Sequence, residues 1–153
     1  MKVSELMNPR VVKVDLKTPL REIIQLMLRT HLNDIVVVNN NDKLLGIVTY
    51  GDLSRRLLPT QQELAEHEEY LTDPGLMEDR VMGIVNVPVE DVMTRKVITV
   101  SPHFDAIKAG AMMTAHHVKQ LPVVEKAKVI GIISHTDIGW GLMMKYNEYM
   151  KGK

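Results

Sequence analysis

The chain carries the same pattern of residues twice, and this repeat constrains its fold more than any other feature. Four pairs match at an offset of 86 positions: Met7 and Met93, Val14 and Val100, Met27 and Met113, and Val37 and Val123. After a turn that is one residue shorter in the second copy, Asp52 matches Asp137. A unit of about 50 residues is only marginally stable alone, because a small domain buries little surface. We therefore expect the two copies to pack into one module with pseudo-twofold symmetry and clefts between them.

Composition and charge exclude several classes of function. The 153 residues include 19 basic and 19 acidic side chains, so no excess positive charge attracts nucleic acid or an anionic membrane. Cysteine is absent, which excludes disulfides, thiolate zinc sites and cysteine nucleophiles. The N-terminus lacks an apolar leader, and no apolar run approaches the ~20 residues that span a bilayer. We expect a soluble, cytoplasmic protein.

Each copy is predicted to run strand, helix, strand, strand, helix, which makes the fold class α+β. The predicted strands are 10–14, 35–38 and 44–49 in the first copy and 96–100, 121–124 and 129–134 in the second. In the first copy Thr18 is a plausible N-cap with Pro19 at the first helical position. The face of this helix is formed by Leu20, Ile23, Ile24 and Met27, and the matching face by Ala106, Ala109, Gly110 and Met113. A final helix is expected to start near Asp52 and near Asp137.

A segment without a counterpart separates the copies. We place the boundaries at 1–58 for the first unit, 59–87 for a helical connector and 88–153 for the second unit with a C-terminal helix. Thr60 and Glu63 fit a capping box that opens a polar helix through about Leu71, and Leu76 to Val85 are predicted to form a second short helix. The connector is rich in acidic residues. Two interpretations stay open, a solvated linker and a docking or regulatory surface.

Three motifs in combination resemble the CBS domain, named for cystathionine beta-synthase. They are Glu-Asp-Val-Met-Thr at 90–94, Leu-Pro-Val-Val at 121–124 and Gly-Ile-Ile-Ser-His-Thr-Asp-Ile at 131–138. The first copy has no proline in its middle motif but keeps Gly-Ile-Val-Thr-Tyr-Gly-Asp at 46–52. Two such domains in tandem resemble a stand-alone Bateman module. The resemblance implies a non-catalytic regulatory sensor that binds AMP, ADP or ATP, with S-adenosylmethionine or NAD-type ligands as the alternative.

The Thr/Ser-x-x-Asp signature has a chemistry of its own. A carboxylate accepts hydrogen bonds from the two hydroxyls of a ribose, and the helix N-terminus that follows favours phosphate oxygens. Aspartate at this place is also a common helix cap. Because the signature occurs twice in register, we favour ribose binding over a purely structural cap.

In similar modules each cleft is shared between the two copies, and this implies two sets of residues. The first cleft is expected to be lined by Thr49, Asp52, Met93, Ile98, Lys119, Gln120, Leu121 and Pro122. The second is expected to be lined by Met7, Val12, Asn33, Asp34, Ile35, Ser134, Thr136 and Asp137. Lys119 favours a phosphate in the first cleft, whereas Asp34 disfavours one in the second. The second cleft is expected to be empty or to hold a less anionic adenosine derivative.

Other candidate sites are weaker. The histidines at 116, 117 and 135 come without a carboxylate cluster, so we expect no metal, and no nucleophile–base set or glycine-rich phosphate loop is visible. Arg55 and Arg56 are either surface charges or phosphate contacts. The apolar C-terminal segment around Trp140 is either intramolecular core or, as we favour, a homodimer interface. A partner effector protein and a ligand-free structural role stay open.

Overall fold

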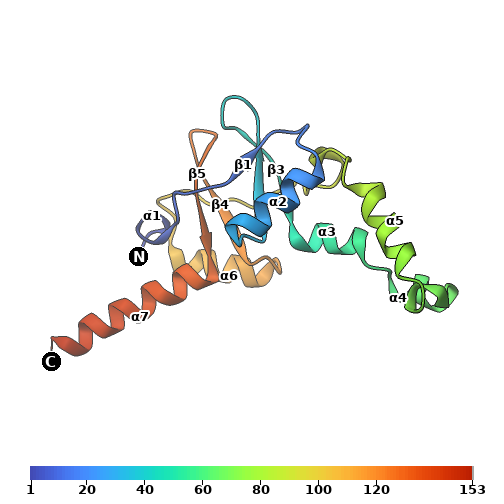
Figure 1. Cartoon of the computed structure of the whole chain (residues 1–153). Helices are drawn as coiled ribbons and strands as arrows, with labels where there is room; N and C mark the ends of the chain where they lie inside the picture. The colour runs from blue at the N-terminus through green and yellow to red at the C-terminus, as the bar shows by residue number, and fades with distance from the viewer. Residues whose placement is uncertain (153) are drawn as a thin grey trace. The chain divides into compact units, whose positions relative to one another are not determined.

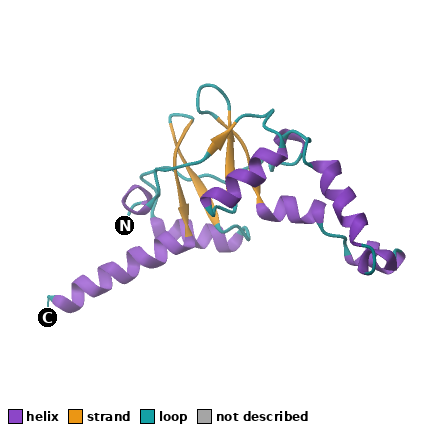
Figure 2. Ribbon diagram, in the orientation of Figure 1, coloured by secondary structure: helices purple, strands orange, loops and turns teal. Residues whose placement is uncertain are grey.

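Each copy of the repeat lends its N-terminal segment to the other copy's core. The computed structural model describes residues 1–152, whose helices and strands are labelled in Figure 1 and coloured by type in Figure 2. The chain divides into two compact units. The α6/α7 unit consists of Met1–Val11, Asn41–Leu44 and Val97–Lys153, and the α2/α3 unit consists of Val12–Asn40 and Leu45–Lys96. These units are interleaved along the chain, whereas the boundaries predicted from the repeat are contiguous. The contiguous boundaries at 1–58, 59–87 and 88–153 therefore stay a prediction of where the repeated sequence begins and ends.

The α2/α3 unit is built on a three-stranded sheet in the order β1-β2-β3. Its elements are β1 (Lys13–Val14), α2 (Leu20–Thr30), β2 (Asp34–Val38), β3 (Leu44–Thr49), α3 (Tyr50–Leu57), α4 (Gln61–Glu66), η1 (Glu68–Leu71), α5 (Pro74–Ile84) and η2 (Val89–Asp91). Strand β1 pairs in parallel with β2, with Lys13 opposite Val36. The parallel pairing requires the crossover that α2 supplies.

The α6/α7 unit is built on an antiparallel hairpin. Its elements are α1 (Val3–Leu6), α6 (Ala106–Ala115), β4 (Gln120–Glu125), β5 (Lys128–Ser134) and α7 (His135–Lys151). Gln120 pairs with Ser134, and the register shifts at a bulge between Val123 and Val124. The strand content and the helices confirm the predicted α+β class.

Both hydrophobic cores contain residues from both copies. The core of the α2/α3 unit is Leu20, Ile23, Met27, Ile35, Val37, Val48, Leu53, Val89 and Met93. The core of the α6/α7 unit is Val3, Val100, Ala106, Ala109, Met113, Leu121, Val123, Ile133 and Ile138. Val89 and Val3 are fully buried, and complete burial of a valine contributes about 1.5–3 kcal/mol. The exchanged segments are therefore held by burial in the core that they join.

The prediction that Thr18 caps the first helix is wrong. Helix α2 has Pro19 at its N-cap and no side-chain cap. The amides of Leu20 and Arg21 instead donate to the carbonyls of Val87 and Val85, both at 2.9 Å. The end of the connector therefore satisfies the helix terminus that the Thr18 hydroxyl was expected to satisfy.

The first predicted strand is shortened in one copy and lost in the other. In the first copy the amide of Arg10 donates to the side-chain oxygen of Asn8, and the amide of Val11 donates to the carbonyl of Pro9. Strand β1 therefore contains only Lys13–Val14. In the second copy the segment 96–100 makes a single bridge, Val100 to Val123. Pro122 explains the loss, because it stands at the position of Val36, whose amide donates to Val12 at 3.2 Å. Proline has no amide hydrogen for this bond.

The connector folds close to prediction. Thr60 and Glu63 form the expected capping box at α4, and α5 covers most of the predicted second helix. The polar helix expected through Leu71 is broken at His67, after which the chain continues as η1. Arg80 of α5 holds this segment to the end of α3. Its Nε donates to the carbonyl of Arg56 at 2.8 Å, and its Nη2 bonds Glu63 at 3.1 Å.

Candidate functional site

The Thr49-x-x-Asp52 signature forms a closed capping box where β3 meets α3. Helix α3 begins at Tyr50, two residues earlier than predicted, so Thr49 is the N-cap and Asp52 lies one turn inside. Asp52 Oδ2 accepts from the Thr49 amide at 2.8 Å and from Thr49 Oγ1 at 2.9 Å. Asp52 Oδ1 accepts from the guanidinium of Arg55. The Asp52 side chain is only 8% exposed.

The second signature repeats this geometry where β5 meets α7. Ser134 is the N-cap, and Asp137 Oδ2 accepts from the Ser134 amide at 2.8 Å and from Ser134 Oγ at 2.6 Å. In residues 1–152 Asp137 Oδ1 has no hydrogen-bond partner. Thr136 lies exposed beside it on the first turn of α7. The position that corresponds to Arg55 is occupied by Trp140, which is 63% exposed.

The loop before the middle strand meets the helix N-terminus in both units. The amide of Tyr50 donates to the carbonyl of Asn33 at 2.7 Å, and the amide of His135 donates to the carbonyl of Lys119 at 3.2 Å. Each of these bonds joins the loop before the middle strand to the Thr/Ser-x-x-Asp signature of the same unit. The second amide of each helix, on Gly51 and on Thr136, bonds no described residue and is free to donate.

The structure distributes each predicted cleft over both units. The α2/α3 unit holds Thr49, Asp52, Met93, Val12, Asn33, Asp34 and Ile35, and the α6/α7 unit holds Ile98, Lys119, Gln120, Leu121, Pro122, Met7, Ser134, Thr136 and Asp137. Within its own unit, the Asn33 carbonyl bonds the N-terminus of α3, and the Lys119 carbonyl bonds the N-terminus of α7. Ile35 and Leu121 are buried core residues, whereas Lys119 is exposed. The pairing of Lys119 with Asp52 stays a prediction.

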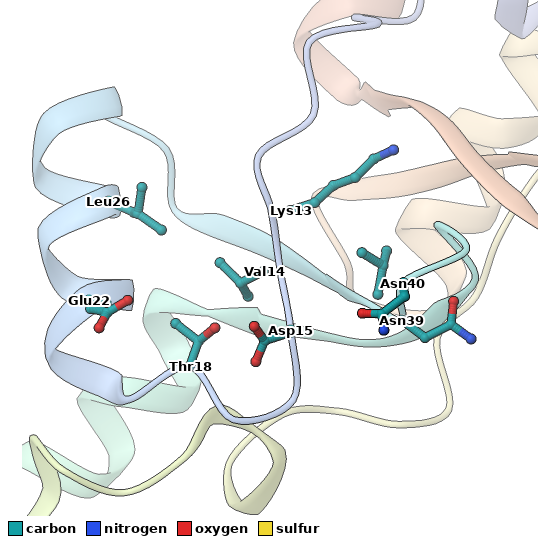
Figure 3. Close-up of a pocket in the computed structure, with 9 residues that line it drawn as sticks. Lys13, Val14, Asp15, Thr18, Glu22, Leu26, Asn39 and Asn40 are labelled. Atoms are coloured by element: carbon teal, nitrogen blue, oxygen red, sulfur yellow. The ribbon is translucent and has the colours of Figure 1, made fainter.

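A cavity of about 360 Å³ lies in the α2/α3 unit, apart from the predicted clefts (Figure 3). It is bounded by β1, the start of α2 and the end of β2, with Asp15, Thr18 and Glu22 at one end and Asn39 and Asn40 at the other. Thr18 is 9% exposed, and its hydroxyl bonds no residue of the described chain. Sequence reasoning missed this cavity because it assigned the Thr18 hydroxyl to the helix cap.

Two absences hold within the described residues. From Met1 to Gly152, no three histidine, cysteine or acidic side chains are grouped so that they would hold a metal ion. No helix in this range has the length and apolar character that crossing a membrane requires.

Solved structures with the same fold are CBS-pair proteins. CBSX2 from Arabidopsis thaliana aligns with a TM-score of 0.77 at 21% identity and covers 95% of this chain and 96% of its own. A complex of CBSX2 with AMP aligns with a TM-score of 0.72 at 20% identity, covering 95% and 98%. The CBS domain pair of MJ0100, in complex with 5-methylthioadenosine and S-adenosyl-L-methionine, aligns with a TM-score of 0.70 at 20% identity, also covering 95% and 98%.

Curated relatives range from small proteins to large ones. The uncharacterized protein MJ1426 of Methanocaldococcus jannaschii is 28% identical over 90% of this chain and 89% of its own length. The chloride channel protein CLC-f of Arabidopsis thaliana is 31% identical over 85% of this chain, which spans only 16% of that protein. The sequence model of the CBS domain matches residues 3–59 and 89–138. The chain therefore belongs to the CBS domain family, with two CBS domains in tandem.

Proposed function

We propose that this protein is a regulatory module that binds an adenosine-containing ligand of the AMP, ADP or ATP type. The observation that carries the proposal is the pair of matching capping boxes, which hold Asp52 and Asp137 in the same geometry in two different units. If the two aspartates served only as helix caps, they would not need to share one geometry in both units. The module is proposed to sense its ligand rather than to transform it.

The chemistry of each box suits a nucleotide. A carboxylate that still has lone pairs accepts the two hydroxyls of a ribose, and a free amide in the first turn of a helix donates to phosphate. Gly51 and Thr136 offer such amides one residue before the bonded amides of Asp52 and Asp137. The solved complexes of CBSX2 with AMP and of MJ0100 with 5-methylthioadenosine and S-adenosyl-L-methionine support an adenosine ligand.

The clefts are proposed to form between the two CBS domains, as the resemblance implies. The first would combine Thr49 and Asp52 with Met93, Ile98 and the residues from Lys119 to Pro122. The second would combine Ser134, Thr136 and Asp137 with Met7, Val12 and the residues from Asn33 to Ile35. Apolar side chains would enclose the adenine while each aspartate holds the ribose.

The signal is proposed to pass through a homodimer or an effector protein, and helix α7 supports the dimer. Ile138 and Gly141 pack this helix on its unit, and Lys145 and Glu148 continue the same stripe by helical spacing. The outer faces are apolar and more than 40% exposed: Trp140, Leu142, Met143, Met144, Tyr146, Tyr149 and Met150. A large exposed apolar surface of this kind is typical of an interaction site.

The proposal is tested by identifying what the purified protein carries. Native mass spectrometry should show a bound adenosine compound, and a thermal-shift panel of AMP, ADP, ATP, NADH and S-adenosylmethionine should show which one stabilises the fold. A ligand at 100 times its Kd stabilises the native state by about 2.7 kcal/mol. Consumption of any of these ligands would instead indicate an enzyme.

A second candidate function is a structural or dimerisation module without a ligand. It is favoured by the fact that both oxygens of Asp52 already accept hydrogen bonds within the chain. On this alternative Asp52 is a buried helix-cap residue, and the function of the protein is dimerisation through α7. Absence of a thermal shift with every adenosine compound, together with a stable dimer, would support it over the sensor.

A further inference from the structure

The two aspartates differ in how much of their hydrogen-bonding capacity is still open. An ionised carboxylate has about four lone-pair positions. Asp52 uses three, for the Thr49 amide, the Thr49 hydroxyl and the Arg55 guanidinium. Asp137 uses two, for the amide and the hydroxyl of Ser134. A ribose diol needs two positions, so it fits Asp137 directly but fits Asp52 only if Arg55 moves away.

Arg55 is free to move. Its side chain is 72% exposed, and among the described residues its only hydrogen-bond or ion-pair partner is Asp52. The adjacent Arg56 differs, because its Nη2 donates to the carbonyl of Asp91 at 3.0 Å and its own carbonyl accepts from Arg80. Arg56 therefore ties α3 to its surroundings, whereas Arg55 is bound only to the proposed ligand-binding group.

We propose that Arg55 selects for phosphate at the Asp52 site. A neutral nucleoside must displace the guanidinium of Arg55 from Asp52, and it has no anionic group to which the released guanidinium can bind. A nucleotide displaces it in the same way, but its phosphate offers the released guanidinium a new anionic partner. This inference rests on the proposed function, and it assigns anionic adenosine nucleotides to the Asp52 site.

The Asp137 site lacks this selection. Trp140 stands where the first copy has Arg55, so nothing competes for Asp137 Oδ1 and no guanidinium is supplied to a phosphate. The site therefore also admits an adenosine compound without phosphate, such as a nucleoside or a thionucleoside. The two boxes are alike in backbone geometry and differ in the residue three positions after the aspartate, which is the cation Arg55 in one and the uncharged Trp140 in the other.

The test is a calorimetric titration with adenosine and with AMP in an Asp137→Asn background, which leaves the Asp52 site as the reporter. Arg55→Ala is expected to raise adenosine affinity about two- to fivefold, since the exposed, solvent-screened guanidinium of Arg55 opposes binding only weakly. The same variant is expected to lower AMP affinity about tenfold, since it removes a charge-assisted bond to phosphate. Opposite shifts for the two ligands are not produced by a general loss of structure.

Two further variants complete the design. Arg55→Lys keeps the positive charge and is expected to retain most of the preference for AMP, whereas Arg56→Ala removes an equal charge one residue away and should change the ratio of the two affinities less than twofold. An unchanged ratio in Arg55→Ala, or an equal change in Arg56→Ala, overturns the role of Arg55 while the proposed function stands. If the background protein binds neither ligand, the proposed function at this site fails and the role of Arg55 fails with it.

Discussion

At the scale of single residues, two glycines let the exchanged segments approach the strands. A Cβ added to Gly46 would lie 2.5 Å from Met93 Sδ and 2.9 Å from the carbonyl oxygen of Thr94. A Cβ added to Gly131 would lie 2.7 Å from Met7 Sδ and 3.2 Å from the carbonyl oxygen of Asn8. The repeat predicts that these glycines and methionines correspond. It does not predict that each glycine contacts the methionine of the other copy.

Gly46→Ala is therefore expected to destabilise the protein by about 1–3 kcal/mol, the usual range for an overfilled core. Gly131→Ala should cost less, because its nearest backbone oxygen is 0.3 Å farther away and the methionine side chain can adjust. Gly83→Ala is the control, because a Cβ there meets nothing within 4 Å. Urea unfolding of the three variants checks the order, and equal stability of Gly46→Ala and Gly83→Ala would contradict the close approach.

At the scale of elements, the connector is a folded segment with its own electrostatic support. The backbone amide of Thr60 donates to the carboxylate of Glu63 at 2.7 Å, and this bond holds the pKa of Glu63 below its ordinary value of 4.5. Arg80 lies near both Glu63 and the ring of Tyr70. These contacts hold the connector in a defined conformation, and its role as a linker or as a docking surface stays a prediction.

The start of α4 is expected to loosen on acidification. The folded pKa of Glu63 is lower than its unfolded value, so the stabilisation is fully present above pH 4.5 and is lost as the pH falls through the folded pKa. The protection factors of the Thr60 and Glu63 amides, taken relative to the intrinsic exchange rate at each pH, should therefore fall below about pH 4.5. Glu63→Gln keeps an acceptor but does not titrate, so its exchange at these amides should not show this step. The same step in both proteins would exclude Glu63 as its cause.

The elements also show how far sequence reasoning reaches in this chain. The hairpin strands, the faces of α2 and α6 and the capping box at Thr60 follow from local periodicity and cap chemistry, and they were predicted. The shortened first strands were not, because the loss of pairing at Pro122 depends on a partner strand far along the chain. The contact of Arg55 with Asp52 was not predicted, because the sequence alone left Arg55 between surface charge and phosphate contact.

At the scale of the whole molecule, the proposed dimer depends on the outer faces of α7. Met143→Glu places a charge on an apolar face and is expected to convert the protein to a monomer in sedimentation velocity at micromolar concentration. Lys145→Glu places the same charge about 200° around the helix, on the stripe that continues the packing face. It should leave the dimer intact. A wild-type monomer, or equal dissociation by both variants, would contradict the α7 interface.

Asp52 and Asp137 are proposed to bind the ribose of an adenosine ligand. The most direct measurement is calorimetric titration of AMP into the wild-type protein and into the Asp52→Asn/Asp137→Asn double variant. Asparagine keeps one oxygen for the capping box but removes the second acceptor that a diol needs. Saturable binding is expected for the wild type, and at least a tenfold loss of affinity for the double variant. Equal affinity in the two proteins, with the variant's thermal unfolding unchanged, would contradict it.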